Sequence, residues 1–428
     1  MKTAIALVAG VLAAAPAFPV RGEEPARMTL AEALSLAREN NPELLAARAD
    51  VETARSQRET AGALPNPVLS YSTSKIPTDG TPSDTIYGND FYSRSYDTVV
   101  SAGMLVEIGG KRSGRRASAD AGIAGADARL ADAERLLDAS VVKAYVAAAV
   151  AARGAALSRE SADSFDRSVA IAREREAAGD VSSADRAQVE IAAGRLRADA
   201  AQADLAAGNA LRALAALLNR PTVALAEDLD ALAAAGDDAG AAPDDGTVLA
   251  RRPDVLALDA AVRRADADLA LQRAFRVPDP TLQVQYEREP PDQRNTFGFG
   301  VSLPLPVLNR NAGPIRAASV AAESARRDFA RGRVRAAQDL AATRQALDVA
   351  TARAARIAGE LAPKAASVRD TIRYAWEEGG ASLLELLEAE RNANDLLLAA
   401  AAAQGDLASA RADYRAARRT APGAPETK

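Results

Sequence analysis

The stretch Asn295–Ile315, NTFGFGVSLPLPVLNRNAGPI, holds the signals that decide the fold. From Phe297 onward, apolar residues alternate with small or polar ones. The apolar positions are Phe297, Phe299, Val301 and Leu303, and the positions between them are Gly298, Gly300 and Ser302. A period of two is typical of a β-strand with one apolar and one polar face. Pro304 and Pro306 should end the strand, and Pro314 suits the first position of a long helix.

An earlier part of the chain repeats this arrangement, which indicates an internal duplication. The segment Asn41-Pro42-Glu43-Leu44 matches Arg252-Pro253-Asp254-Val255, and Pro65-Asn66-Pro67 matches Pro278-Asp279-Pro280. Each copy is predicted to contain a helix, two strands, a long helix, a glycine turn and a last helix. The predicted strands are Val68–Ile76, Tyr92–Val106, Leu282–Glu287 and Phe297–Leu303.

Long helices are predicted for most of the remaining chain. Thr29-Leu-Ala-Glu32 is a capping box, which marks the start of a helix. The predicted helices are Leu30–Glu39, Glu43–Ala61, residues 117–178, Ser183–Leu218, the tract from Pro314 to Trp376, and Ser382–Ala417. In the third of these, small and apolar residues recur every seven positions, as at Leu130, Leu137, Ala144 and Ala151. This seam favours close antiparallel coiled-coil packing in a helix roughly 90 Å long.

The composition excludes several classes of protein. Of the 428 residues, 48% are hydrophobic but only 4% are aromatic, because alanine is so frequent. Cysteine and histidine are absent, so disulfides, a thiolate nucleophile, an imidazole base and His/Cys metal sites are all excluded. The formal net charge is −5, and no basic stripe points to a nucleic acid. We therefore expect elongated helical packing, no cofactor, no resident metal and no enzyme.

The chain divides into five segments by composition. Residues 1–22 have Lys2, an apolar core and small residues, as in a secretory signal peptide, with cleavage after Ala15, Ala17 or Gly22. Without a cysteine, no lipid anchor is expected. The first repeat is predicted at 23–221, an Ala/Asp/Gly-rich linker at 222–247, the second repeat at 248–420, and a disordered tail at 421–428.

Four strands with an apolar outer face fit a transmembrane β-barrel, but four cannot close one, since about eight are needed. Other copies of the chain must therefore pair with the free edges, which makes a homo-oligomer the expected state. Three copies would supply twelve strands, continued by a tube of long helices. The alternative is that two small hairpins cap a soluble coiled coil.

The chain resembles the TolC-like outer-membrane factors of bacterial efflux systems over nearly its whole length. The resemblance rests on the paired repeat, on Thr29–Ala33 with Asn41-Pro42, on Arg251–Asp254, on Ser302–Pro306 and on the two glycine turns. It implies a mainly α fold with a small β part: a trimer whose 12-stranded outer-membrane barrel continues as a periplasmic α-helical barrel. Glu107–Arg112 and Leu308–Asn311 are most similar to the heavy-metal (CzcC-type) branch. That likeness implies a periplasmic adaptor and an inner-membrane RND pump as partners.

The same resemblance assigns candidate site residues to the periplasmic ends of the helices. Gly179 and Asp180 in the first repeat, and Gly379 and Gly380 in the second, would form the tips that meet the adaptor. Glu385 and Glu388 match a two-carboxylate motif that lines the channel entrance in the family. Lying three residues apart, they share a helix face, and in a trimer six such carboxylates would favour cations. The alternative is an ordinary solvated helix face.

Three further positions belong to this region. Asp185 is the first-repeat counterpart of Glu385 and is expected to hold the closed tip or to meet the adaptor. Trp376 stands where the family has a gating tyrosine, and Ala381 where it has a latch arginine. A closing network of Tyr, Arg and Asp is thus incomplete here. Trp376 would close the entrance by its size, or it is simple packing.

Other functions remain as alternatives. The run Gly109-Gly110-Lys111-Arg112 lacks the first glycine and the Ser/Thr of a phosphate-binding loop, so we interpret it as a strand-to-helix turn. Within the resemblance, a duct for drugs, dyes or peptides remains open, because a channel wall need not identify its cargo. A periplasmic adaptor or a secreted structural coiled coil is the second alternative; an adaptor would show one helical hairpin in a β-rich domain.

Overall fold

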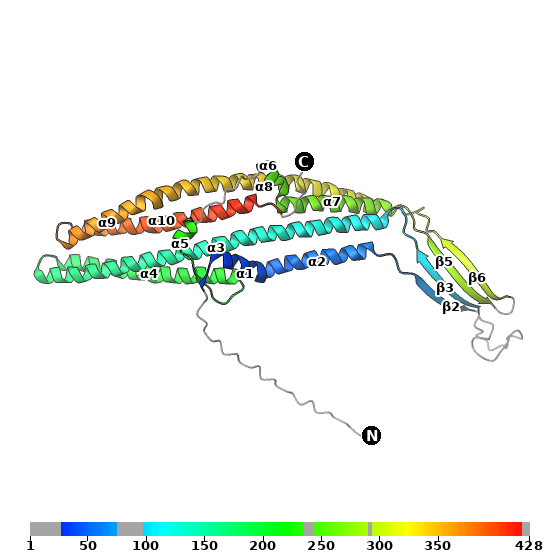
Figure 1. Ribbon diagram of the computed structural model, residues 1–428, viewed down its shortest axis with the longest axis horizontal. Helices are drawn as coiled ribbons and strands as arrows, with labels where there is room; N and C mark the ends of the chain where they lie inside the picture. Colours follow the sequence, from blue (N-terminus) through cyan, green and yellow to red (C-terminus); the bar gives the residue numbers. More distant parts are fainter. Residues whose placement is uncertain (1–26, 75–96, 235–243, 290–292, 422–428) are drawn as a thin grey trace, which may run out of the picture.

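Two units of the same plan follow one another along the chain (Figure 1). The computed structural model describes residues 27–74, 97–234, 244–289 and 293–421. The first unit contains β1 (Arg27–Met28), α1 (Leu30–Asn40), α2 (Pro42–Gly62), β2 (Val68–Ser74), β3 (Asp97–Leu105), α3 (Lys111–Ala178) and α4 (Ser183–Leu217). The connection holds β4 (Ala224–Leu225), α5 (Leu229–Ala234) and α6 (Asp245–Arg251). The second unit contains α7 (Pro253–Ala274), β5 (Thr281–Glu289), β6 (Gln293–Ser302), α8 (Ala312–Arg356), the π-helical turn η1 (Ile357–Leu361), α9 (Ala362–Glu377) and α10 (Leu383–Arg418).

Helix starts in both units follow local sequence signals. Thr29 and Glu32 form the expected capping box of α1. Pro42 begins α2 and Pro253 begins α7, so the two matched motifs stand at the same point of each repeat. A proline is tolerated at the first helical position because its missing N–H would have no partner there anyway. The duplication inferred from the sequence is therefore reproduced in the helices.

The strands form one antiparallel sheet in the order β2-β3-β5-β6 (Figure 1). Its register aligns apolar residues across all four strands on one face. Two such rows are Leu69, Ala102, Val284, Phe299 and Tyr71, Val100, Tyr286, Phe297. On the other face, Ser70, Ser101, Gln285 and Gly298 share a row. The side chains of Phe297 and Phe299 are 79% and 88% exposed, so the apolar face is uncovered in a single chain.

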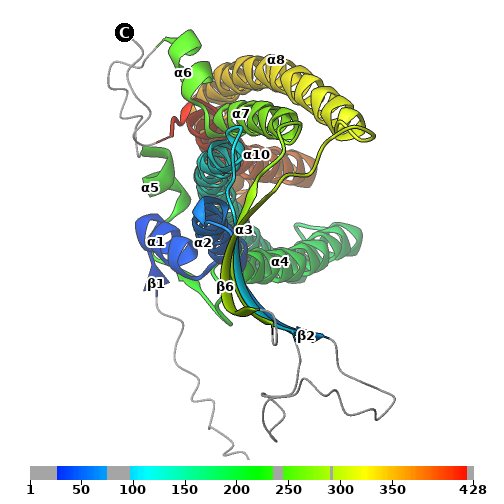
Figure 2. The same cartoon turned by 90° about the vertical axis from the view of Figure 1, so that its right-hand side faces the viewer.

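The helices lie side by side in the same order as the strands. Helix α3 packs against α2 and α4 on one side and against α7 and α10 on the other, and α8 packs against α7 and α10. Viewed toward the sheet, the helices form an arc with α4 and α8 at its ends (Figure 2). The edge strands β2 and β6 are joined to α2 and α8, and α2 takes the place of α4 as the end helix of the arc in the half of the molecule nearer the sheet (Figure 1). Each chain is thus a curved slab with two open edges.

The core of the slab is thin and rich in alanine. Of the four seam residues of α3, Leu137 is buried and Leu130, Ala144 and Ala151 are half-buried. The deepest positions are Val141, Ala148 and Ala155, which recur every seven residues between them and are at most 2% exposed. Small residues allow helices to approach closely. Gly405 of α10 is one such position, since a Cβ there would lie 2.3 Å from Cγ2 of Val150. One alanine-rich window of α3 is apolar enough to span a membrane by length and composition alone, with 39% of it buried.

The structure differs from the sequence-based expectations in the bounds of two helices. Helix α3 begins at Lys111 rather than near residue 117, because the left-handed Gly110 ends the preceding turn. The helix from Pro314 to Trp376 is interrupted by η1, since Pro363 has no N–H for a regular helical bond. The linker 222–247 contains β4, α5 and the start of α6. The predicted signal peptide, most of the tail and the loop 77–89 lie outside the described residues.

Candidate functional site

The first candidate tip joins α3 to α4 at the end of the molecule farthest from the sheet (Figure 1). Gly179 has a φ of +88°, which a residue with a side chain rarely adopts, so glycine is required there. The Asp180 N–H donates to the Arg175 carbonyl at 2.9 Å and closes the turn. Ser182 caps α4, and its hydroxyl donates to Oδ2 of Asp185 at 2.7 Å.

The second tip, between α9 and α10, repeats the geometry of the first. Gly379 has a φ of +82°, and the Gly380 N–H donates to the Ala375 carbonyl at 2.7 Å. Ser382 and Glu385 form a capping box, in which Oε2 of Glu385 accepts from the Ser382 N–H at 2.7 Å. Hydrogen bonds from the backbone and the hydroxyl of Ser382 hold the pKa of Glu385 below its usual value.

Both predicted entrance carboxylates are therefore at the second tip, but they differ in what holds them. Glu385 is exposed, and one of its oxygens is occupied by the cap of its own helix. Glu388 is exposed one helical turn later. From residue 374 to 388 the sequence contains four glutamates and no lysine or arginine. The segment 374–388 therefore contributes only negative charge to this tip, where Arg175 of the first hairpin is the neighbouring cation.

Trp376 is buried within the chain rather than presented at a free surface. It is 3% exposed and packs in a cluster with Phe165, Val169 and Leu386, among others, from both hairpins. The guanidinium of Arg175 lies 5.8 Å from the centre of its ring. In this structure Trp376 is therefore a packing residue between the two hairpins. Ala381, at the predicted latch position, packs against the same cluster.

An ion pair links the two helices of each hairpin, and the sequence analysis missed both pairs. Arg173 contacts Glu190 in the first hairpin at 2.9 Å. Arg373 contacts Glu390 in the second at 2.5 Å, and the Glu390 side chain is only 6% exposed. The arginine and the glutamate occupy the same positions in the two repeats, one on each side of the glycine turn. That repetition is the signal that would have revealed them.

A groove of about 440 Å³ lies between the hairpins, close to the tips. Its walls come from α3, α4 and α10, and Ser161 donates to Oδ1 of Asn394 across it at 3.0 Å. Charged residues of both signs line it, including Arg195, Asp199 and Arg391. The groove therefore combines charged side chains with apolar ones such as Phe165 and Ile191.

A second network ties the helices to the sheet. Lys111, at the start of α3, is 3% exposed, and its Nζ lies 2.6 Å from Oδ1 of Asp279 and 2.6 Å from the Val277 carbonyl. The same Asp279 oxygen accepts from the Ile108 N–H at 2.9 Å. A Cβ on Gly109 would lie 2.8 Å from the Cβ of Val277. The backbone of Gly109 in the first repeat therefore contacts the Val277 side chain in the second. The glycine–basic run is thus a clamp between the central strands β3 and β5.

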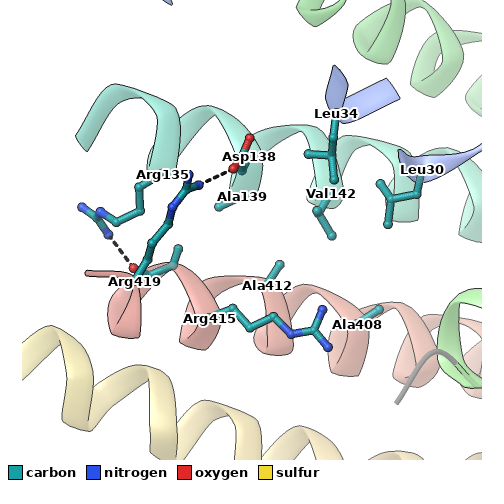
Figure 3. Close-up of a pocket in the computed structure, with 11 residues that line it drawn as sticks. Leu30, Leu34, Arg135, Asp138, Ala139, Val142, Ala408, Ala412, Arg415 and Arg419 are labelled. Carbon is teal, nitrogen blue, oxygen red and sulfur yellow. Dashed lines mark hydrogen bonds and ion pairs between the residues drawn. The ribbon is translucent and has the colours of Figure 1, made fainter. Parts of the chain in front are cut away.

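A pocket of about 250 Å³ lies midway along the helices, between α1, α3 and α10 (Figure 3). Its floor is apolar, with Leu30, Leu34 and Val142, and arginines stand at its rim. Asp138 accepts from Arg38 at 2.8 Å and from Arg419, while Arg135 donates to the Ala416 carbonyl at 3.3 Å. These contacts hold the three helices together and arrange no catalytic group. Among the described residues, no group of three or more His, Cys, Asp or Glu is placed to hold a metal.

Comparisons with known proteins agree with this architecture. The family of outer membrane efflux proteins matches residues 33–220 and 246–418, which is more than half of the chain. The cobalt-zinc-cadmium resistance protein CzcC of Cupriavidus metallidurans is 27% identical over 380 residues, covering 88% of this chain and 86% of CzcC.

Solved structures show the same fold. A crystal structure of CusC superposes with a TM-score of 0.76 at 18% identity, covering 92% of each chain. The open state of the MtrE outer membrane channel of Neisseria gonorrhoeae superposes with a TM-score of 0.74 at 23% identity, covering 91% of this chain and 88% of MtrE. The outer-membrane channel OprN superposes with a TM-score of 0.75 at 19% identity, covering 91% of this chain and 89% of OprN. With its duplicated helix–strand units, its apolar sheet face and its matched residues, the chain belongs to the outer membrane efflux protein family and is an outer-membrane channel, not an enzyme.

Proposed function

We propose that three copies of the chain form one continuous duct through the outer membrane and into the periplasm. The observation that carries this proposal is that the open edges of the sheet and of the helical layer lie on the same two sides of the chain. In the part of the chain that the structure describes, β2 and β6 are each paired on one side only, and α2 and α8 are the helices joined to them. A head-to-tail contact between unlike edges forms a ring when the rotation closes. Three copies of a four-stranded sheet give twelve strands, which satisfy every edge N–H and C=O in the bilayer.

Engineered cysteines test this assembly, because the native chain has none. Ser70→Cys on β2 is combined with Thr296→Cys, Gly298→Cys or Gly300→Cys on β6, all on the polar face. Oxidation should give covalent dimers and trimers, with trimers as the largest product. The matched control pairs Ser70→Cys with Gln285→Cys on the central strand β5. Absence of cross-linking for all three β6 positions would contradict the closed ring.

The proposed cargo is a heavy-metal cation, moved by an inner-membrane RND pump through a periplasmic adaptor. Support comes from the likeness to CzcC, whose name gives cobalt, zinc and cadmium, and from the acidic second tip. The test is the amount of cell-associated zinc, cobalt, cadmium and copper in a deletion strain, beside retention of a hydrophobic dye. Retained metal with normal dye supports the proposal. Retained dye with normal metal would assign the duct to drug or general export.

The tips are the proposed entrance. Glu385 and Glu388 would form the carboxylate ring, and Asp185 would help to hold the closed state. Gly179, Asp180, Gly379 and Gly380 form the turns that the adaptor would meet, next to the groove lined by Arg195 and Arg391. Opening would separate the two hairpins around these turns. An adaptor that cross-links equally well to the far sheet end would contradict this docking position.

Export to the outer membrane is proposed to use residues 1–22 as a cleaved signal peptide, with no lipid attached because cysteine is absent. The functional units are then 23–221 and 248–420, joined through 222–247, with 421–428 as the tail. Recovery of the mature protein in the soluble periplasmic fraction would instead favour an adaptor or a structural coiled coil. Mass measurement of the purified protein checks the cleavage site.

A further inference from the structure

The boundary between sheet and helices carries an excess of positive charge. We call residues 58–67, 106–116, 270–280 and 303–317 the junction belt; they comprise the helix ends and connecting segments next to the four strands. Its basic residues are Arg58, Lys111, Arg112, Arg115, Arg116, Arg273, Arg276, Arg310 and Arg316. Its acidic residues are Glu59, Glu107 and Asp279. The whole chain has a net charge of −5, so this belt is positive in an acidic protein.

Most of the negative charge in the belt is already neutralised within the chain. Glu107 is held by Arg115 through two hydrogen bonds, and Asp279 is held by Lys111. Arg112 donates to the Gly62 carbonyl at 2.7 Å. Five arginines are left exposed with no ion pair to any described residue: Arg116, Arg273, Arg276, Arg310 and Arg316. The belt therefore has guanidinium groups available to an external anion.

The two helices that start in the belt also differ from four of the helices that start elsewhere. The N-caps of α3 and α8 are Gly110 and Asn311, both left-handed, with no side-chain cap and no acidic residue in the first turn. By contrast α1, α4, α6 and α10 each have a capping side chain and an acidic residue in the first turn. Uncapped helix N-termini have unpaired N–H groups and a positive dipole end. They add to the positive potential of the five arginines.

The belt also contains large apolar side chains that are exposed in the single chain. Leu64 is 56% exposed, Phe275 47%, Leu305 72% and Leu308 100%. Exposed apolar groups beside exposed arginines are typical of a membrane interface, where the stem of the side chain lies in acyl chains and the head lies in the polar layer. The mixture fits a lipid headgroup better than a soluble anion, which would gain nothing from the apolar rim.

We propose that the junction belt binds the phosphate groups of anionic glycerophospholipids in the leaflet next to the helices. This rests on the proposed function, in which the sheet spans the bilayer. A guanidinium presents two parallel N–H groups that match a phosphate, so arginine suits this contact better than a point charge does. Bound headgroups would set the depth of the sheet in the membrane and the level at which the helical tube begins.

The test measures lipid choice at the belt directly. Phe275→Trp places a fluorescent reporter beside the arginines, while the single native tryptophan, Trp376, lies in the last turn of α9 at the far tip. The protein is reconstituted into phosphatidylcholine vesicles with phosphatidylglycerol as the minor lipid, and bromine is placed on the acyl chains of one lipid or the other. Stronger quenching by brominated phosphatidylglycerol, at matched bromine content, reports its preference for the site. One basic residue near the lipid surface raises the affinity for an anionic lipid about fivefold. We therefore expect phosphatidylglycerol to be preferred over phosphatidylcholine by about fivefold or more.

Matched variants assign that preference to the belt. Changing Arg116, Arg273, Arg276, Arg310 and Arg316 to Gln should bring the preference to about one. The control changes five exposed arginines of the same chain outside the belt, Arg48, Arg129, Arg167, Arg335 and Arg356, to Gln, and should keep it. Inorganic phosphate at equal ionic strength should not abolish it. If it does, the belt is a simple anion site and the lipid proposal is wrong.

The remaining outcomes separate this inference from the proposed function. Suppose that both brominated lipids quench equally when the belt arginines are unchanged, in vesicles that conduct ions. That result would overturn the inference but would not contradict the proposed duct. No quenching by either lipid would show that the sheet is outside the bilayer, and both would fail. A belt variant with altered ion selectivity but unaltered lipid preference would place the arginines in the lumen and also overturn the inference.

Discussion

Arg175 of the first hairpin contacts Trp376 of the second through both its backbone and its ring. Nη1 of Arg175 donates to the Trp376 carbonyl at 2.9 Å, and the guanidinium lies 5.8 Å from the centre of the indole. The carbonyl belongs to the last turn of α9, where the regular helical hydrogen bonds end. A tryptophan in place of a gating tyrosine thus comes with an arginine from the opposite repeat. The contact joins the two hairpins at the level of the tips.

Arg175→Ala should weaken closure of the entrance. The change removes a hydrogen bond from a charged donor, about 1.5–3 kcal/mol, and a cation–π contact of about 0.5–1 kcal/mol. Single-channel recordings should therefore show higher conductance or more frequent opening. Arg167→Ala, an exposed arginine of the same helix, is the control and should conduct as the parent does. Unchanged conductance for Arg175→Ala would show that this contact does not limit opening.

Glu388→Gln should lower cation selectivity without disturbing the fold, because this side chain is exposed and caps nothing. Glu385→Gln should lower selectivity and also loosen the start of α10, since Glu385 closes the capping box. The double variant should have the smallest preference for cations. Reversal potentials in asymmetric KCl give the selectivity, and hydrogen exchange at residues 383–386 gives the fraying. Normal selectivity in the double variant would remove the carboxylate ring from the mechanism.

The same cap gives the second tip a pH dependence. The pKa of Glu385 is lower in the folded protein than its ordinary value of 4.5, so the folded state holds the ionised form. Its stabilisation is present above pH 4.5 and is lost as the pH falls through the lower, folded value. Fraying of α10 should therefore increase in that acid range in the parent protein. Glu385→Gln should fray equally above and below it.

Lys111→Met should destabilise the junction between barrel and helices by about 3–5 kcal/mol, because it leaves the Asp279 carboxylate without its partner. The yield of folded oligomer on an unheated denaturing gel measures this. The double variant Lys111→Met/Asp279→Leu should recover much of that yield, since it removes both charges. Arg129→Met, an exposed basic residue farther along the same helix, is the control. Equal loss in the single and double variants would show that the ion pair is not the cause.

The sequence predicted the parts of the fold that have a local period or a local stop signal. Strand β6 follows from the alternation at Phe297 and Phe299, and α1 follows from its capping box at Thr29. The break at Pro363 had a local signal as well, which the long alanine-rich tract obscured. Strands β1 and β4 had none, because two residues of parallel pairing are too short to show a pattern.

The partners of the site residues were not predictable, because they depend on how the two repeats face each other. Lys111 and Asp279 belong to different repeats and meet only because β3 pairs with β5. Trp376 is buried because α3, α4, α9 and α10 turn particular faces toward one another. The apolar pattern of a single helix does not predict that arrangement. The sequence motifs therefore located the tips, whereas the packing of the two repeats determines which tip residues are exposed.

Tyr145→Phe should detach the N-terminal strand from the helical wall. The Tyr145 side chain is buried on α3, and burial raises the pKa of its hydroxyl, so it remains a donor at neutral pH. It donates to the Met28 carbonyl at 2.7 Å and accepts from the Glu227 N–H at 3.2 Å, which joins β1 to the segment after β4. Phenylalanine fills the same space but leaves that N–H unpaired, at about 1–3 kcal/mol. Thermal unfolding should occur at lower temperature, and proteolysis near residue 28 should be faster than in Tyr374→Phe, whose ring is 67% exposed. Equal proteolysis of the two variants would mean that the β1–β4 pairing holds the N-terminal segment without Tyr145.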